Sequence, residues 1–256
     1  KRTWVPQGHV YKITVSQANF GTINQITVAS KGFEFRRLGN SPAATHITNA
    51  INDFKPDIIA IGYSWSMSSN EARVFVDYLK KRGVMLVFSE ESGGMGNFMQ
   101  AVFEDPTITT TNLTPSGRVY RLSNMSHEIL NGPFGDFRGL QWGDDGNNTR
   151  ALIGLPLSEI ETISNGVNIS ASTPSGTNGH VTAFVHRTLN LVYFGDGGFT
   201  AGQNTSYGDT DTYNTSQVFT INNATEAKPI PNTNYGASSS KRFTVYNSML
   251  FGNIMN

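Results

Sequence analysis

Residues 56–103 have the sequence PDIIAIGYSWSMSSNEARVFVDYLKKRGVMLVFSEESGGMGNFMQAVF, which predicts the order strand, helix, strand, turn and helix. The two runs that predict strands, residues 58–61 and 84–88, are apolar at every position. Strands without polar alternation are typical of parallel sheets that helices cover on both faces. The segment therefore predicts successive crossover units of a parallel α/β sheet, with right-handed connections.

Helical signals lie between the two runs. Ser68 and Ser69 offer N-caps, and Glu71 places a carboxylate in the first turn, where it suits the helix dipole. Gly83 is expected to end this helix in the left-handed conformation. Four apolar residues at helical spacing predict its buried face: Ala72, Phe75, Val76 and Leu79.

The second run continues into a turn, residues 89–94, with the sequence SEESGG, and a further helix is expected from about residue 94 to 103. In open α/β sheets, ligands bind at the carboxyl ends of the strands. We therefore expect any functional site of this sheet to include the turn that follows residue 88.

The remaining sequence predicts further strands and helices around this segment. Residues 1–40 predict strands at 10–15, 25–29 and 33–38. These strands are expected either to form an irregular β segment that leads into the sheet or to pack as a piece on its edge. Ser41 and Pro42 favour a helix start, with the helix running to Phe54. Short strands are expected at 119–122, 151–155, 161–164, 168–171, 181–186 and 191–195, a long polar loop at 200–241, and a closing helix at 242–256. The chain, residues 1–256, thus predicts one three-layer α/β domain with added β-hairpins in its second half.

The composition excludes several classes of function. The formal net charge is zero, so no bulk attraction to nucleic acid or to anionic membranes is expected. The chain has no Cys, which rules out disulfides, thiolate metal sites and a Cys nucleophile. Only 15% of residues are charged, and Asn, Thr, Ser and Gly take up the difference. This composition is typical of secreted or surface proteins, so we predict an extracytoplasmic location with a signal segment removed and no membrane span.

Three motifs resemble a known superfamily. Residues 70–89 form a helix that leads through Arg82-Gly83 into an apolar strand. Residues 127–134, HEILNGPF, look like a His-Pro-Ile-x-Asn-Gly-Pro-Phe connection, with Glu128 where Pro is usual. Residues 192–199, VYFGDGGF, are similar to a Gly-Asp-Ser-x-Phe strand end, and the closing helix carries a Phe and paired Asn residues.

Together these motifs resemble the class I glutamine amidotransferase-like superfamily over residues 42–256. The nearest resemblance is to its non-amidotransferase branch, which includes trehalose-utilisation-like domains and amidotransferase-like domains of Bacteroidetes surface proteins. The resemblance implies a flavodoxin-like fold with a mostly parallel sheet. It does not carry over catalysis, because a Cys would stand in a Gly-x-Cys-x-Gly elbow where this chain has Ser89-Glu90-Glu91, and the late strand ends in Asp196-Gly197-Gly198 without the catalytic His and Glu.

Four residues are candidates for chemistry at the sheet edge. Glu90 and Glu91 could share a proton, bind a cation or bind sugar hydroxyls. Asp196, at the end of a second strand, is expected to approach Glu90 across the same sheet edge. Alternatively, one Glu caps or braces the next helix and the other is solvated, and Asp196 accepts N–H bonds within a turn from Gly198 and Phe199. Ser89 could replace the Cys nucleophile only with a His beside it, and the sequence indicates none.

Other residues are candidates for binding. Aromatic residues in predicted loops could form a carbohydrate platform or pin the loops: Trp65, Trp142, Tyr207, Tyr213 and Tyr235. Gly93 and Gly94 give a glycine-rich turn without the Lys of a P-loop, so no nucleotide or other cofactor is predicted. Oxygen-rich turns at Asp144-Asp145 and Asp209-Thr210-Asp211 could hold Ca²⁺, although Asp-Gly is first a turn signal. The five His residues show no metal-ligand spacing.

These observations predict a non-catalytic binding or structural module of an extracytoplasmic protein. The expected partner is a carbohydrate or another surface protein, which would bind at the carboxyl edge of the sheet and to the 200–241 segment. The alternative is a hydrolase that acts on a sugar or ester through Glu90, Glu91 and Asp196.

Overall fold

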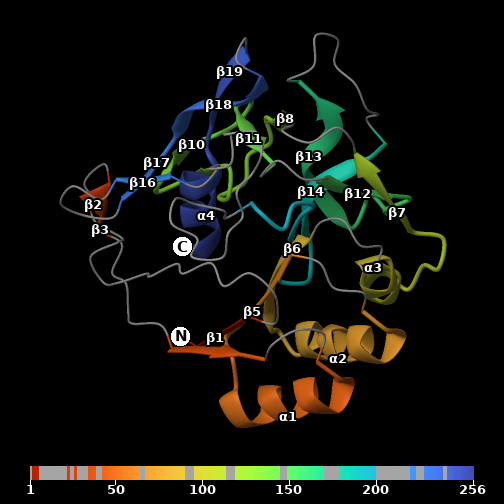
Figure 1. The fold of residues 1–256 in the computed structure, drawn as a ribbon. Helices are drawn as coiled ribbons and strands as arrows, with labels where there is room; N and C mark the ends of the chain where they lie inside the picture. Colours follow the sequence, from red (N-terminus) through yellow and green to blue (C-terminus); the bar gives the residue numbers. More distant parts are fainter. Residues whose placement is uncertain are drawn as a thin grey trace.

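The computed structural model describes thirteen stretches of the chain. They are residues 2–5, 22–23, 26–27, 34–38, 42–63, 67–89, 95–113, 119–144, 149–169, 179–199, 220–222, 228–238 and 241–256. The elements and contacts below belong to these stretches (Figure 1).

Five parallel strands form one half of the main sheet, in the spatial order β4-β1-β5-β6-β15. Their bounds are β1 Arg2–Val5, β4 Glu34–Arg37, β5 Ile58–Tyr63, β6 Val84–Ser89 and β15 Leu191–Phe194. Numbered along the chain, these five parallel strands stand in the order 2-1-3-4-5, which is the order of flavodoxin-like folds. The predicted α/β, flavodoxin-like fold class is therefore confirmed.

The second half of the sheet is antiparallel. From β15 the pairing continues through β14, β13, β8 and β11, and β12 branches from β14 to pair with β7. Their bounds are β7 Thr109–Leu113, β8 Val119–Leu122, β11 Gln141–Gly143, β12 Thr149–Ile153, β13 Ile160–Asn168 and β14 Val181–His186. The antiparallel half matches the prediction of added β-hairpins in the second half of the chain.

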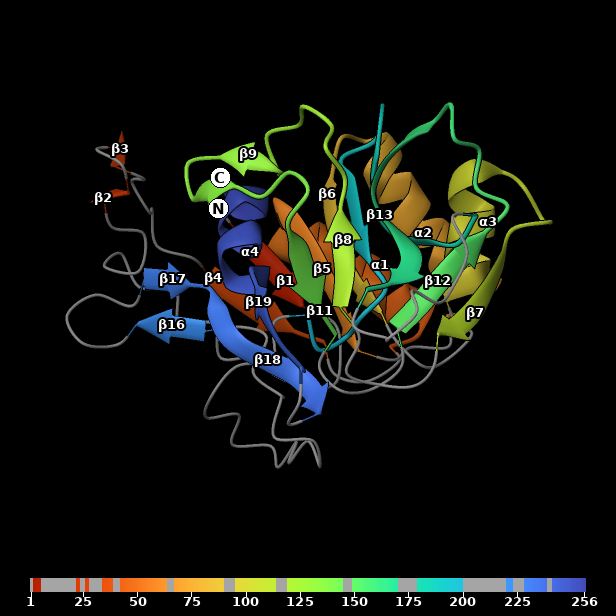
Figure 2. The same ribbon diagram turned by 90° about the horizontal axis from the view of Figure 1, so that it is seen from above.

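The helices lie on both faces of the sheet. α1 (Ala44–Phe54), α2 (Ser69–Lys80) and α3 (Met95–Phe103) cover one face, and α4 (Asn247–Met255) lies on the other (Figures 1 and 2). This gives the three layers that the sequence predicts. Within the described stretches, none of the helices combines the length and apolar character that crossing a bilayer requires.

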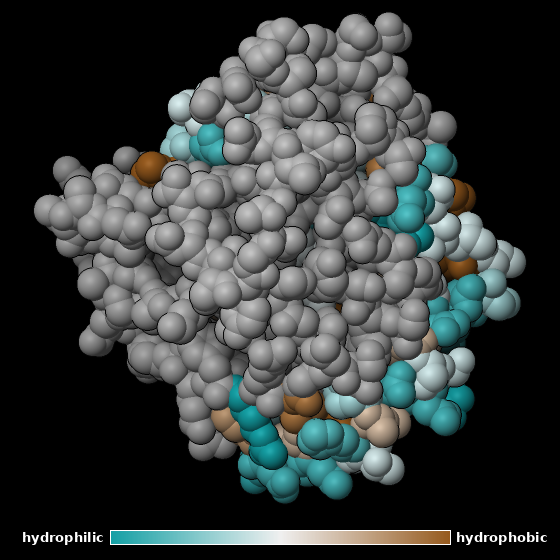
Figure 3. Space-filling view, in the orientation of Figure 1, coloured by the Kyte–Doolittle hydropathy of each residue, from teal (hydrophilic) through white to brown (hydrophobic). Residues whose placement is uncertain are grey.

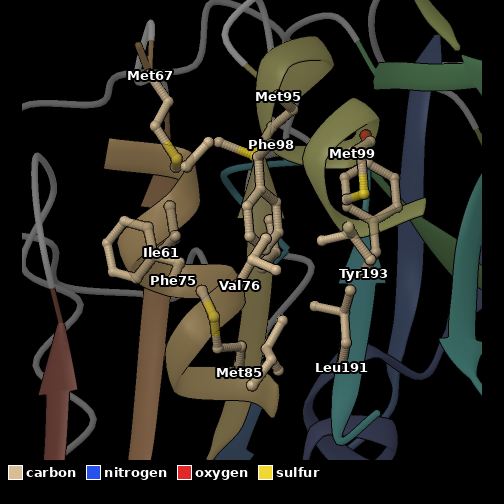
Figure 4. Packing of buried hydrophobic residues seen from close by; sticks show 14 of the residues in the cluster. Ile61, Met67, Phe75, Val76, Met85, Met95, Phe98, Met99, Leu191 and Tyr193 are labelled. Carbon is tan, nitrogen blue, oxygen red and sulfur yellow. The ribbon is translucent and has the colours of Figure 1, made fainter. Parts of the chain in front are cut away.

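Two hydrophobic cores follow from the alternation of side chains along the central strands. Ile59, Met85 and Leu191 join the core beneath α1–α3, whereas their neighbours Ile58 and Leu86 join the core against α4. Figure 4 shows the first core, where sulfur-containing and aromatic side chains interlock: Met67, Phe75, Met85, Met95, Phe98 and Met99. Burying one such side chain contributes about 1.5–3 kcal/mol.

The start of α2 follows its local sequence. The Ser68 hydroxyl accepts the Glu71 N–H at 3.5 Å, and the Glu71 carboxylate accepts the Ser68 N–H at 2.7 Å. These reciprocal bonds form a capping box, which satisfies two amides that would otherwise lack a helical partner. The predicted N-cap is therefore confirmed at Ser68.

The end of α2 differs from the prediction. Arg82, with φ 66°, takes the left-handed conformation, and Gly83 does not. Gly83 is needed for another reason, because a Cβ there would lie 2.2 Å from the Tyr78 ring. The Tyr78 hydroxyl donates to the Pro56 carbonyl at 3.0 Å, and burial raises the pKa of Tyr78 to about 12. Tyr78 thus ties the end of α2 to the start of β5, and only glycine leaves room for its ring.

The N-terminal part is more closely joined to the sheet than its sequence indicates. β1 lies between β4 and β5, and its sequence, RTWV, has too few apolar residues to suggest an inner strand. β4 confirms the strand expected at 33–38, and a short pair, β2 (Thr22–Ile23) and β3 (Ile26–Thr27), overlaps the one expected at 25–29. The strand expected at 10–15 lies outside the described residues. α1 begins at Ala44 with Ala43 as N-cap, two residues later than Pro42 predicts.

The C-terminal part corrects three predictions. Residues 242–245 belong to strand β19, not to the closing helix, because RFTV alternates with period two. The expected 200–241 loop contains strands, and the expected strands at 161–164 and 168–171 overlap the single strand β13. The remaining short strands are β9 Asn131–Gly132, β10 Gly135–Asp136, β16 Thr220–Asn222, β17 Lys228–Ile230, β18 Asn232–Ser238 and β19 Lys241–Val245.

Candidate functional site

Asp196 is the candidate carboxylate that the structure places at the carboxyl edge of the parallel strands. Phe194 pairs in parallel register with Phe88, so Asp196 leaves the sheet beside the point where β6 ends at Ser89. Its side chain is fully buried, with 0% exposure. The edge is where flavodoxin-like folds bind ligands, but this carboxylate does not face solvent.

A tight turn encloses Asp196. Its Oδ1 accepts the Gly198 N–H at 3.1 Å, and its backbone carbonyl accepts the Phe199 N–H at 3.3 Å. The predicted hydrogen bond from the Gly198 N–H to the Asp196 side chain is therefore confirmed. The Phe199 N–H instead donates to the Asp196 backbone carbonyl. Phe199 closes the turn by stacking on Phe88, with ring centroids 5.2 Å apart. A local hydrogen bond and a core aromatic thus fix the carboxylate in place.

Arg150 of β12 crosses the end of β15 at very short range. The Arg150 N–H donates to the Gly195 carbonyl at 2.5 Å, and the Tyr193 hydroxyl donates to the Arg150 carbonyl at 2.9 Å. A Cβ on Gly195 would lie 1.8 Å from that same carbonyl oxygen. Glycine before Asp196 is therefore required by the close approach of two backbones.

The pKa of Tyr193 depends on its burial and on two charged neighbours. Burial raises the pKa of Tyr193 above its ordinary value, the Arg150 charge lowers it, and the Asp196 charge raises it. Arg150 is 5% exposed, and its guanidinium lies 3.5 Å from the Thr110 hydroxyl. A carboxylate, a guanidinium and a neutral phenol thus share one buried region at the sheet edge, where charge interactions are stronger than in water.

Most other predicted site residues lie outside the described residues. These are Trp65, Glu90, Glu91, Gly93, Gly94, Asp145, Tyr207, Asp209, Asp211 and Tyr213, and at Ser89 only the backbone is described. Whether Glu90 and Asp196 approach each other therefore stays a prediction. The same holds for a calcium site at Asp145, Asp209 or Asp211.

Trp142, Tyr235 and Asp144 occupy places that the sequence does not predict. Trp142 lies in β11 and Tyr235 in β18, both 0% exposed, so the prediction that they stand in loops is wrong. The Tyr235 hydroxyl donates to the Asp144 carbonyl and to its Oδ1, and the Thr149 hydroxyl donates to Oδ2 at 3.0 Å. These bonds attach the β18–β19 hairpin to the sheet, because both carboxylate oxygens of Asp144 accept protein hydroxyls.

Two of the described His residues, His127 and His186, have structural partners. The His127 Nδ1 accepts the Ile129 N–H at 3.1 Å, as expected for a His within its own turn. The His186 Nδ1 accepts two N–H groups of its turn, from Thr188 and Leu189. Across the described part of the chain, no three His, Cys, Asp or Glu side chains are grouped to hold a metal ion.

Sequence reasoning overlooks three polar residues with structural roles. Arg150 stands in a largely apolar strand and carries no local signal of its approach to β15. Asn247 and Asn253 lie in the closing helix, and their side chains bind distant backbone groups. Asn247, for example, donates to the carbonyls of Gly143 at 2.8 Å and Phe199 at 3.1 Å. The resemblance of this helix to a motif with paired Asn residues was the signal that could have found Asn253, whose role is structural.

No protein-family model and no curated protein sequence matches the chain. Among solved structures it is similar to a GMP synthase subunit from Thermoplasma acidophilum, at TM-score 0.45 and 10% identity over 99% of this chain and 92% of that one. It is also similar to a ThuA-like protein from Bacteroides uniformis, at TM-score 0.45 and 9% identity over 77% of this chain and 81% of that one. A ThuA-like protein from Parabacteroides merdae is similar at TM-score 0.43 and 13% identity, over 75% of this chain and 78% of that one. Similarities of this size concern the path of the chain and say nothing of its activity, so the superfamily resemblance stays a prediction.

Proposed function

We propose that this chain is a non-catalytic binding or structural module of an extracytoplasmic protein. In this proposal it has an amidotransferase-like fold and recognises a glycan or another surface protein. Recognition takes place at the carboxyl edge of the parallel strands and through the segment 200–241.

The burial of Asp196 is the observation that carries the proposal. A general acid or base must come within hydrogen-bond reach of its substrate. Asp196 has 0% exposure, and its Oδ1 accepts the N–H of Gly198 in a turn closed by Phe199. The absence of Cys from the whole sequence removes the thiolate on which the superfamily's amide hydrolysis depends.

The composition supports the proposed location and partners. Charged residues make up 15% of the chain and the net charge is zero, which favours neutral polar partners over nucleic acid. Tyr207 and Tyr213, in an Asn- and Thr-rich segment, supply aromatic rings of the kind that stack on sugars. Detection of the native protein by antibody on intact cells, compared with permeabilised cells, tests the location.

A glycan array, followed by calorimetry with the best-bound glycan, tests the binding role. Wild-type protein should bind at least one glycan, and Tyr207→Ala with Tyr213→Ala should abolish this binding. Tyr207→Phe with Tyr213→Phe is the matched control, because it keeps the stacking ring and should retain binding. Absence of any glycan binding, together with no partner among purified surface proteins of the same organism, would reject the proposal.

The second candidate is a carboxylate-dependent hydrolase of a sugar or ester. The observation in its favour is that Asp196 stands where β15 ends, beside the end of β6, at the sheet edge where such folds bind ligands. A panel of p-nitrophenyl glycosides and esters tests it, with Glu90→Gln and Glu91→Gln as inactive variants. Turnover by wild-type protein that Glu90→Gln removes would establish the hydrolase and overturn the binding module.

A further inference from the structure

Two of the three edges of the main sheet are protected against further strand pairing. β4 has charged residues at three of its four positions, Glu34, Arg36 and Arg37. β11 has only three residues, and β19 lies against it, since the Gln141 amide donates to the Thr244 carbonyl at 2.8 Å. Charge, shortness and covering are the usual means by which proteins keep edge strands from pairing with other chains.

Among the described residues, none of these protections is found at the third edge, β7. Its sequence, TTTNL, has no charge and no Pro, and it pairs with β12 over five positions without a register shift. Within the described part of the chain, β12 is the only strand that pairs with β7. Thr109 and Asn112 are exposed, and both ribbon views place β7 at the outer margin of the sheet (Figures 1 and 2). An uncharged edge rich in β-branched Thr, with no bulge in its pairing, is a template for another strand.

We propose that β7 pairs antiparallel with β7 of a second copy of this chain, so that one sheet continues through a two-fold dimer. With the two-fold axis through Thr111, Thr111 pairs with Thr111 of the second copy, and Thr110 pairs with Asn112 of the second copy. Each edge supplies main-chain donors and acceptors to the other, and Thr–Thr pairs across strands are favourable. An isologous contact needs a self-complementary surface, and an uncharged strand pairing with itself meets no like-charge repulsion.

Main-chain hydrogen bonding, not burial of an apolar patch, is what this surface offers. The described surface over α1–α3 and toward β7 is mainly hydrophilic (Figure 3). Leu157, with 67% exposure, is the one large hydrophobic side chain exposed among the described residues, and it lies beyond β12 in the chain. One strand pair of five residues covers a small interface, so the dimer is weak and reversible, dissociating at micromolar concentrations.

Sedimentation equilibrium from low to high micromolar protein tests this pairing. Wild-type protein should pass from monomer to dimer, and the double variant Thr109→Lys/Asn112→Lys should raise the dimer dissociation constant at least about tenfold, because edge lysines block pairing. Both positions are exposed, so the variant should fold with an unchanged circular dichroism spectrum and Tm. Thr45→Lys/Asn52→Lys, on exposed positions of α1, makes the same residue changes and should dimerise like wild type.

Amide hydrogen exchange gives a second readout, since exchange of the β7 amides should slow as protein concentration rises. A wild-type protein that stays monomeric at all concentrations would overturn the proposal. Dimerisation that the β7 lysines leave unchanged would overturn it as well. If the wild-type protein stays monomeric but binds a synthetic peptide with the sequence of residues 107–113, the dimer is rejected and β7 is instead a binding site for a strand of another protein.

Discussion

The side-chain oxygen of Asn253 accepts the backbone N–H of Phe134 at 2.8 Å, although 119 positions separate the two residues. The amide nitrogen of the same side chain donates to the carbonyls of Ile129 and Gly135, both at 3.1 Å. A Cβ on Gly132 would lie 2.6 Å from the Asn253 oxygen, so that glycine leaves room for the bond. The connection at 127–134 and the closing helix, which carry much of the superfamily resemblance, therefore form one structural clip.

Asn253→Ala should destabilise the protein strongly. It leaves one buried N–H and two carbonyls without the side chain that now pairs with them, and each such group costs about 1–3 kcal/mol. We expect a loss of about 2–4 kcal/mol in the free energy of unfolding by urea. Asn256→Ala, at an exposed position of the same helix end, should change it by less than about 0.5 kcal/mol. Equal effects at the two positions would show that the clip contributes nothing.

Gly195→Ala should prevent normal folding or cost more than about 3 kcal/mol. The added Cβ would meet the Arg150 carbonyl, a backbone atom that cannot turn aside, at 1.8 Å. Gly62→Ala is the matched control, because Gly62 is also buried, within the parallel strand β5, and a Cβ there meets nothing within 4 Å. Expression and urea unfolding of both variants measure the difference. A Gly195→Ala protein as stable as Gly62→Ala would contradict the close approach of β12 to β15.

Lys55→Gly should stabilise the protein by about 0.5–1 kcal/mol. Lys55 ends α1 with φ 49°, a left-handed conformation that costs a residue with a Cβ about 1–2 kcal/mol, part of which the entropy of glycine offsets. Lys81→Gly makes the same change at the end of α2, where φ is −89°, and should destabilise by a similar amount. Thermal unfolding should move Tm in opposite directions for the two variants, and a shift of the same sign in both would refute the strain at Lys55.

Stability should fall as the pH drops below about 6.5, in part through His186. Burial lowers the pKa of His186 below its ordinary value of 6.5, against an opposing effect of Glu159. Its side chain is 4% exposed, and Nδ1 accepts the N–H groups of Thr188 and Leu189, so it cannot also hold a proton. The unfolded chain therefore binds a proton at a higher pH than the folded one. The contribution is complete above pH 6.5 and is lost as pH falls through the lowered folded-state pKa.

Urea unfolding between pH 5 and pH 8 measures this effect. His186→Gln should flatten the dependence of stability on pH, whereas His46→Gln, at an exposed position of α1, should leave it as in wild type. An unchanged slope in His186→Gln would remove His186 from the acid response.

Local signals were sufficient for several elements of the parallel half. The apolar runs that became β5 and β6 and the Ser68 capping box depend on neighbours in sequence, and the structure contains each of them. The turn at Asp196 was open to prediction for the same reason, since its side chain bonds to Gly198 only two residues away. The Thr-rich β7 was not, because four of its five residues are polar and show no apolar alternation.

The sequence by itself determined the parallel α/β class, the absence of a thiolate nucleophile and the position of the candidate carboxylate at a strand end. The tertiary structure alone decided that β1 lies inside the sheet, that Trp142 and Tyr235 are buried, and that Arg150 meets Gly195. Helix caps and turns are fixed by residues a few positions apart. Burial and strand order are fixed by which distant surfaces pack together, and no local pattern of residues records that choice.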